Sequence, residues 1–221
     1  MNIPFSIEDF MNVFRHYNSS FRLMPPVMYI LGFVSVGLLF SRRTISNRII
    51  SGILAFFWVW MGAVYHIGYF STINKASLLF GVLFIVQGLV IFLYGSVAGR
   101  MDFHAGLNRR SIVAFVFVLY ALIVYPLLGY LLGHVYPASP VFGMAPCPTT
   151  IFTFGVLLLC RGRVQLFVYL IPFLWAIVGM SAAVNLGVYE DFGLTIAGVL
   201  GVVIIISGNR KLKTKVEGRM K

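Results

Sequence analysis

Long apolar runs, separated by short polar segments, constrain this chain more than any other feature of its sequence. Of its 221 residues, 60% are hydrophobic and only 10% are charged, whereas a soluble core of this size would leave many more charges on its surface. A helix needs roughly 17–25 residues to cross a hydrocarbon layer of ~30 Å. Seven runs approach or reach this length: Met24–Phe40, Ile49–Phe70, Ala76–Ala98, Ile112–Leu132, Pro146–Cys160, Val164–Val184 and Phe192–Gly208. They predict an all-α integral membrane protein with seven transmembrane helices, of which the fifth is the weakest.

The positions of the basic residues predict how these helices are oriented. With the N-terminus outside, the inner connections and the C-terminal tail hold 14 of the 17 Lys and Arg residues. Only Arg15, Arg22 and Lys75 then lie outside. Because cytoplasmic segments of membrane proteins are enriched in Lys and Arg, we expect an outer N-terminus and a cytoplasmic C-terminus. This orientation requires the fifth run to cross, since otherwise Arg161 and Arg163 would lie outside.

The connections are too short for a second domain, so we expect a single transmembrane domain over residues 1–221. We expect residues 1–23 to form an outer-surface amphipathic helix. Ser6 and Asp9 resemble the capping box of a helix N-terminus. Its aromatic residues recur at helical spacing: Phe10, Phe14, Tyr17 and Phe21. This helix either lies in the membrane interface or packs on the bundle and covers its outer mouth.

The remaining segments are a seven-span bundle, residues 24–208, and a basic cytoplasmic tail, residues 209–221. The tail is expected to bind anionic lipid headgroups. The net charge of +11 is not expected to reflect nucleic-acid binding, because no basic groove with interleaved aromatic residues accompanies it. A homo- or hetero-oligomer is left open by the sequence.

The fifth run enters the membrane through Pro146-Cys147-Pro148, and this entry predicts an interrupted span. If Pro148 occupies the first helical turn, the helix is Pro148–Cys160, and its thirteen residues extend only about 20 Å. The irregular segment before it must then cover the remaining depth, which is tolerated only where backbone is buried in protein or lines a cavity. The N-terminus of this half-helix, with Thr149 and Thr150, would point into that cavity and could hold an anionic group. A tilted helix in a thinned membrane is the alternative.

Polar residues in the apolar runs gather toward the outer side. Tyr65 and His66 share one face of the second run, Gln87 lies in the third, and His134 follows the fourth. Either they form an interfacial belt with hydrogen bonds between helices, or they line a vestibule open to the outside. We predict a ligand site floored by Pro146–Thr150. Its candidate residues are Tyr65, His66, Gln87, His134, Cys147, Thr149 and Thr150.

Charged residues are absent from the middle of every run, which argues against a proton pump or a carrier with a central carboxylate. The adjacent pair Glu190 and Asp191 is typical of a solvated turn or a helix cap. No catalytic residues are predicted, since no pair of carboxylates within the membrane suits acid–base chemistry.

The two cysteines are predicted to stay unpaired, because Cys147 and Cys160 lie about 20 Å apart along one helix. Cys147, Met144, His66 and His134 could together form a soft-metal or redox site, and the two histidines alone could ligate a haem. Inert packing of a cysteine among apolar residues is the competing interpretation. The sequence therefore leaves the cofactor unknown.

Several stretches resemble a family of uncharacterised bacterial polytopic membrane proteins, a domain of unknown function. They are Pro4-Phe5 with Tyr17-Asn18, Trp60 to Phe70 with Ile73-Asn74, FGMAPCPTTIFTFG (Phe142–Gly155) and LGVYEDFGL (Leu186–Leu194). The resemblance implies a multi-pass protein of the bacterial inner membrane and no established activity.

Three functions are compatible with these features. The first is a small carrier, channel or receptor that binds a ligand from the outer side, and it predicts a polar pocket under Pro146–Thr150. The second is a non-catalytic subunit or assembly factor of a larger membrane complex, which predicts a dry interior. The third is a metal or redox site, which requires Cys147, His66 and His134 to meet at one point.

Overall fold

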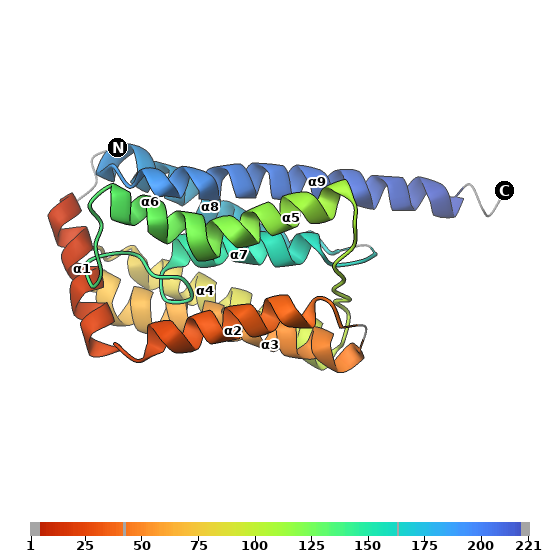
Figure 1. Ribbon diagram of the computed structural model, residues 1–221, viewed down its shortest axis with the longest axis horizontal. Helices are drawn as coiled ribbons and strands as arrows, with labels where there is room; N and C mark the ends of the chain where they lie inside the picture. Colours follow the sequence, from red (N-terminus) through yellow and green to blue (C-terminus); the bar gives the residue numbers. More distant parts are fainter. Residues whose placement is uncertain (1–4, 42, 163, 218–221) are drawn as a thin grey trace.

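The computed structural model describes residues 5–41, 43–162 and 164–217, and the regular elements in these ranges are all helices. In chain order they are α1 (Ile7–Ser20), α2 (Met24–Leu38), α3 (Thr44–Trp60), η1 (Met61–Tyr69), η2 (Phe70–Thr72), α4 (Ser77–Ile91), η3 (Phe92–Val97), α5 (Arg109–Leu119), η4 (Tyr120–Val124), α6 (Tyr125–Leu131), α7 (Pro146–Leu158), α8 (Phe167–Leu186), η5 (Tyr189–Asp191) and α9 (Phe192–Glu217). Figure 1 shows most of them running side by side along the long axis, with α1 lying across one end. The prediction of an all-α fold is confirmed.

Five helical segments are long and apolar enough to cross a membrane within the described ranges. They are Thr44–Thr72, Ser77–Val97, Arg109–Leu131, Phe167–Leu186 and Tyr189–Arg210. Helices α1 and α2 meet the same test only as a pair, and they are bent by 87° relative to each other. Helix α7 is apolar but has only 13 residues. The structure therefore supports five or six spans by length and composition.

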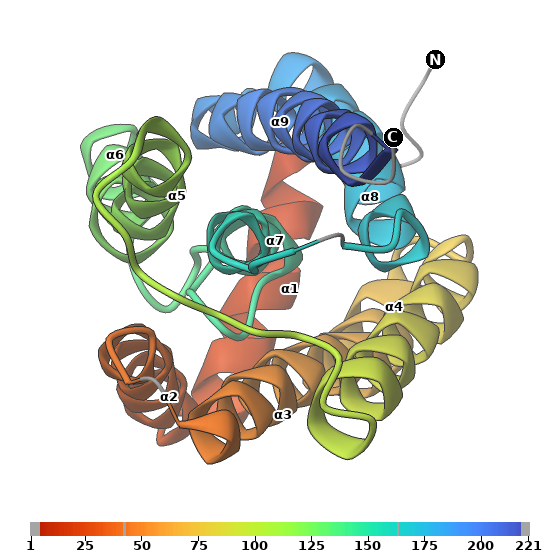
Figure 2. The same ribbon diagram turned by 90° about the vertical axis from the view of Figure 1, so that its right-hand side faces the viewer.

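Helix α7 stands at the centre of the bundle. Seen from one end, α2, α3, α4, α5, α8 and α9 surround it (Figure 2). Every α7 residue except Cys147 is buried. A helix that is apolar all round is expected in such a position, where protein covers each of its faces. This explains how a 13-residue helix can occur here, because the unpaired N–H and C=O groups at its two ends meet protein and not lipid.

The connection between η3 and α5 closes the end of the bundle beyond the C-terminus of α7. Its backbone N–H at His104 donates to the Leu159 carbonyl at 2.9 Å, and Asp102 accepts from the Arg161 N–H at 2.6 Å. On α3, the Asn47 side chain donates to Asp102 at 3.0 Å and accepts from the Phe103 N–H at 3.0 Å. The bond to Leu159 satisfies a carbonyl at the end of α7, and the Asn47 bonds hold the connection across that end.

Helix α1 covers the opposite end. The predicted capping box is present, with Ser6 and Asp9 exchanging side-chain to backbone bonds. The aromatic stripe packs inward on the bundle, which agrees with the second of the two expected arrangements. Tyr17 accepts from the Trp60 indole at 2.6 Å, and Asn18 donates to the Pro137 and Ser139 carbonyls at 2.7 and 2.9 Å. The helix is thereby fixed to both α3 and the loop that leads into α7.

Glycines allow neighbouring helices to approach closely at Gly62 and Gly179, each of which stands four residues after a tryptophan, Trp58 or Trp175. A Cβ added at Gly62 would lie 2.6 Å from the Gly81 carbonyl oxygen of α4, and one at Gly179 would lie 2.5 Å from the Leu194 side chain of α9. Small residues are typical of such contacts in membrane proteins.

We expect Thr153→Val to destabilise the central helix. The Trp58 indole donates to Thr153 Oγ1 at 3.1 Å, and this hydroxyl donates to the Thr149 carbonyl at 2.8 Å. Valine fills the same space but leaves the buried indole N–H unpaired, which costs about 1–3 kcal/mol. The free energy of unfolding can be measured by denaturant titration in mixed micelles. Thr153→Ser keeps the acceptor and should lose less; equal stability of wild type and Thr153→Val would contradict this role.

Candidate functional site

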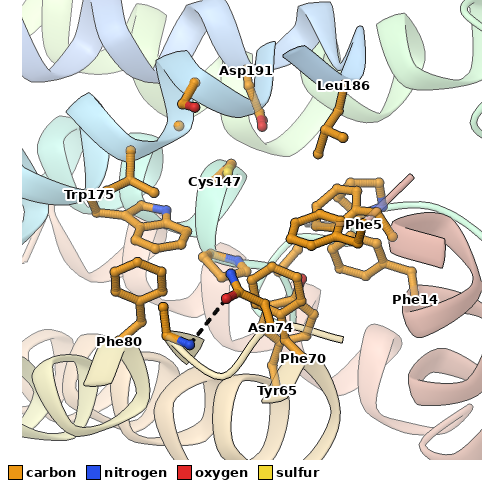
Figure 3. Close-up of a pocket in the computed structure, with 18 of the residues that line it drawn as sticks. Phe5, Phe14, Tyr65, Phe70, Asn74, Phe80, Cys147, Trp175, Leu186 and Asp191 are labelled. Carbon is orange, nitrogen blue, oxygen red and sulfur yellow. Dashed lines mark hydrogen bonds between the residues drawn. The ribbon is translucent and has the colours of Figure 1, made fainter. Parts of the chain in front are cut away.

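A cavity of about 300 Å³ lies between α1 and the N-terminal end of α7. Figure 3 shows side chains from α1, η1, η2, α4, α7, α8 and η5 converging on it. Its wall is largely aromatic, formed by Phe5, Phe10, Phe14, Tyr65, Phe70, Phe80, Tyr125 and Trp175. The rings support one another, since Phe14 stacks on Tyr65 at 5.1 Å and Phe80 meets Trp175 edge-on at 5.4 Å between centroids.

Three polar groups meet at one side of this cavity. The Asp191 side chain at the end of η5 is buried, and its Oδ1 accepts from the Tyr125 hydroxyl at 2.6 Å. The Cys147 thiol lies beside the Asp191 carboxylate and near the Trp175 indole. No acceptor among the described residues meets hydrogen-bond geometry with the buried Trp175 Nε1. The cavity therefore joins an apolar body to a small polar corner.

The start of α7 differs from the expected one by two residues. The helix runs from Pro146 to Leu158 rather than from Pro148 to Cys160, and its length of 13 residues is as predicted. Prolines at the first and third positions remove two of the N–H groups that a helix N-terminus normally offers. Ala145, Pro146 and Cys147 line the cavity. This helix end is consequently a weaker anion site than the sequence suggested.

Thr149 and Thr150 lie beneath the cavity and outside its lining. The Thr149 hydroxyl accepts from the Gly143 N–H at 2.8 Å and donates to the Ala145 carbonyl at 2.7 Å. Gly143 adopts φ +77°, a left-handed conformation that glycine takes at little cost. Thr149 thus satisfies the backbone of the irregular entry segment. Thr150 Oγ1 is buried without a hydrogen-bond partner among the described residues.

The π-helical segment η1 presents Tyr65 to the cavity and places His66 behind its wall. The His66 ring is fully buried, 4.6 Å from Phe84 and 5.1 Å from Trp175 between centroids. Ser77 donates its hydroxyl proton to the His66 carbonyl at 2.8 Å and lies 3.1 Å from Nδ1. Nδ1 must therefore carry the proton of the neutral ring. Nε2 is then a buried acceptor, and no donor reaches it among the described residues.

Gln87 lines neither this cavity nor the smaller one that His134 lines. Its amide donates to the Val168 carbonyl at 2.8 Å and ties α4 to α8. The amide oxygen is buried and has no partner in the described part of the chain. Gln87 is thus placed as an interhelical contact.

His134 lines a second cavity of about 180 Å³, which shares Tyr125 and Pro140 with the first. Its Nδ1 lies 2.7 Å from Glu190 Oε1, and the Glu190 side chain is buried. The hydrogen bond to Glu190 raises the pKa of His134; the negative charges of Glu190 and Asp191 act in the same direction, against partial desolvation. The pair links the loop after α6 to η5.

Glu190 and Asp191 are the site residues that sequence reasoning missed. Each is only 1% exposed, so the expectation of a solvated turn is wrong. Their burial follows from the packing of η5 against α6 and α8. One signal was available: the acidic pair stands between apolar runs in a connection that contains no Lys or Arg.

The candidates for a metal site do not come together. In residues 5–41, 43–162 and 164–217, no three His, Cys, Asp or Glu side chains are close enough to hold a metal ion. His66 is bound to Ser77, His134 to Glu190, and Met144 is fully buried. Cys147 and Cys160 are both unpaired, as predicted.

The fold and the cavity define a class of protein: a helical bundle in which several helices, long and apolar enough to cross a membrane, surround a short, enclosed central helix. The chain belongs to the Family of unknown function (DUF6064), whose model matches residues 7–216. No curated protein and no solved structure is significantly similar to it. Membership in the family agrees with the resemblance to a domain of unknown function.

We expect the ion pair between His134 and Glu190 to make the stability of the protein depend on pH. Because the folded-state pKa of His134 is raised, its stabilising contribution is complete below the unfolded pKa, about 6.5. It is lost as the pH rises through the folded pKa. The stability difference between wild type and His134→Gln, measured by thermal unfolding in detergent, should thus be larger at low pH. A difference that is constant with pH would contradict the pairing.

Proposed function

We propose that this protein binds a small ligand from the outer side of a bacterial inner membrane, as a small carrier, channel or receptor. One observation carries the proposal: the cavity beneath α1 combines an aromatic wall with the converging polar groups of Asp191, Cys147 and Trp175. Concave, mostly apolar pockets with a few polar groups are the usual form of small-molecule sites.

The proposed topology has seven spans, with the N-terminus outside and the C-terminus in the cytoplasm. The arrangement of the helices supports it, because α7 connects the two ends of the bundle despite its length. The α2–α3, η3–α5 and α7–α8 connections all lie at the end opposite α1 (Figure 1). This end of the bundle holds most of the basic residues outside the tail, including Arg48 near the start of α3, Arg100 in the η3–α5 connection and Arg110 at the start of α5, which is the distribution that the positive-inside rule describes.

A non-catalytic subunit of a larger complex is the alternative, for which a dry, fully packed interior was expected. The cavity argues for ligand binding over this alternative. The expected anionic group is disfavoured at the α7 N-terminus, because two prolines and the nearby carboxylate of Asp191 reduce its positive potential.

We expect a reporter that is active only outside the cytoplasm to be silent when it is fused after Lys221. The same reporter placed before Met1, behind a suitable export signal, should be active. Reporter activity in whole cells is the measurement. Activity after Lys221 would contradict the seven-span orientation, which rests on the 14 basic residues expected inside.

Ligand entry can be tested through the Cys147 thiol, which is half-buried in the cavity lining. In a Cys160→Ala background, N-ethylmaleimide should modify Cys147 in the detergent-solubilised full chain. Benzyl alcohol, benzylamine and benzoate share a phenyl ring and differ in charge. At least one of them should slow the modification of Cys147 by N-ethylmaleimide, with an effect that saturates as its concentration rises.

A pair of variants on α8 controls this experiment. Val178→Trp fills the cavity and should abolish both labelling and protection. Val184→Trp adds the same side chain at a position that is 62% exposed on the outside of the bundle and should change neither. If none of the three compounds protects Cys147, or if both tryptophan variants behave alike, the proposed ligand site is wrong.

A further inference from the structure

We propose that the cavity beneath α1 takes an organic monocation: an ammonium group with apolar substituents. This inference rests on the proposed function and names its ligand class. It begins with Asp191, a carboxylate that is 1% exposed and lines the cavity. A buried carboxylate is unfavourable unless a cation or several donors compensate it.

The protein supplies little compensation of its own. The described lining of the cavity contains no Lys, Arg or His. Tyr125 donates one neutral hydrogen bond to Asp191, and the nearby thiol of Cys147 is also uncharged. His134, the basic side chain that interacts with Asp191, is bound to the second carboxylate, Glu190, at 2.7 Å. Among the described residues, Glu190 and Asp191 therefore share this one basic partner.

The aromatic wall suits the same ligand. Eight aromatic side chains line a volume of about 300 Å³. Cations are attracted to aromatic faces within about 6 Å, and aromatic enclosures are the usual sites for substituted ammonium groups. An apolar neutral molecule would gain from the wall but leave the carboxylate unpaired, whereas an anion would face Asp191 directly.

Trp175 adds a second, independent requirement. Its indole N–H lines the cavity, is buried, and has no acceptor in hydrogen-bond geometry among the described residues. Figure 3 shows the indole on the same side as Cys147 and Asp191. A ligand that carries an oxygen acceptor close to its ammonium group would satisfy both the carboxylate and this donor.

The test uses two probes of one shape: choline and its uncharged carbon isostere, 3,3-dimethylbutan-1-ol. Both carry a hydroxyl group, so only the positive charge differs. Binding is followed by protection of Cys147 from N-ethylmaleimide in the Cys160→Ala full chain, and independently by the shift in thermal unfolding. Choline should bind at least about tenfold more tightly than its isostere, since an opposite buried charge is worth 1.4 kcal/mol or more.

Asp191→Asn should erase this preference and leave the affinity for the isostere unchanged. The asparagine oxygen can still accept from Tyr125, so the local structure is conserved. Glu190→Gln is the matched control: it removes the adjacent negative charge, which lines the second cavity and not the first, and the preference for choline should persist. Phe80→Leu should weaken choline more than the isostere.

Equal affinity for the two probes, or an unchanged preference in Asp191→Asn, would overturn the cationic ligand class. Protection of Cys147 by benzyl alcohol under those conditions would leave the proposed ligand site intact. If neither probe protects Cys147 and no benzyl compound does, both the ligand class and the proposed function are wrong.

Discussion

The complete enclosure of α7 is the constraint on which the rest of this structure depends. A helix in contact with lipid must be long enough to cross it, because unpaired backbone groups in hydrocarbon are strongly unfavourable. Helix α7 avoids this requirement since neighbouring helices surround it and polar segments close its two ends. At one end, the His104 N–H donates to the Leu159 carbonyl and the Tyr169 hydroxyl donates to the Leu157 carbonyl. At the other end, Thr149 accepts from the Gly143 N–H of the entry segment. The space left above the shortened helix becomes the cavity.

The features that could be predicted from the sequence are those governed by local rules. Proline is tolerated in the first turn of a helix and disfavoured further along it. The late start of α7, and therefore its short length, could be predicted from Pro146–Pro148. The capping box at Ser6 and the inward stripe of α1 followed from spacing in the same way. Even here the boundary of α7 shifted by two residues, because both prolines fit into the first turn.

The features that could not be predicted depend on which helix faces meet. His134 pairs with Glu190 across 56 positions of the chain, and Tyr125 reaches Asp191 across 66. The absence of Lys and Arg from the connection is the one local signal that separates this buried acidic pair from a solvated turn. Likewise Tyr65 and His66 are adjacent in sequence, but η1 turns only Tyr65 toward the cavity. Gln87 looked like a site residue because it is polar and central, yet its partner is a carbonyl of α8.

The groups around the N-terminus of α7 do not favour the anion that a helix end usually attracts. A free helix N-terminus attracts anions through its N–H groups and its dipole. Here prolines remove two of those donors, Thr149 accepts from the Gly143 N–H, and the acidic residues Glu190 and Asp191 are buried at the same end of the bundle. The short α7 therefore ends before the α1 end of the bundle and leaves space for the cavity. The aromatic rings of the neighbouring helices and the Asp191 carboxylate of η5 determine the chemistry of the cavity.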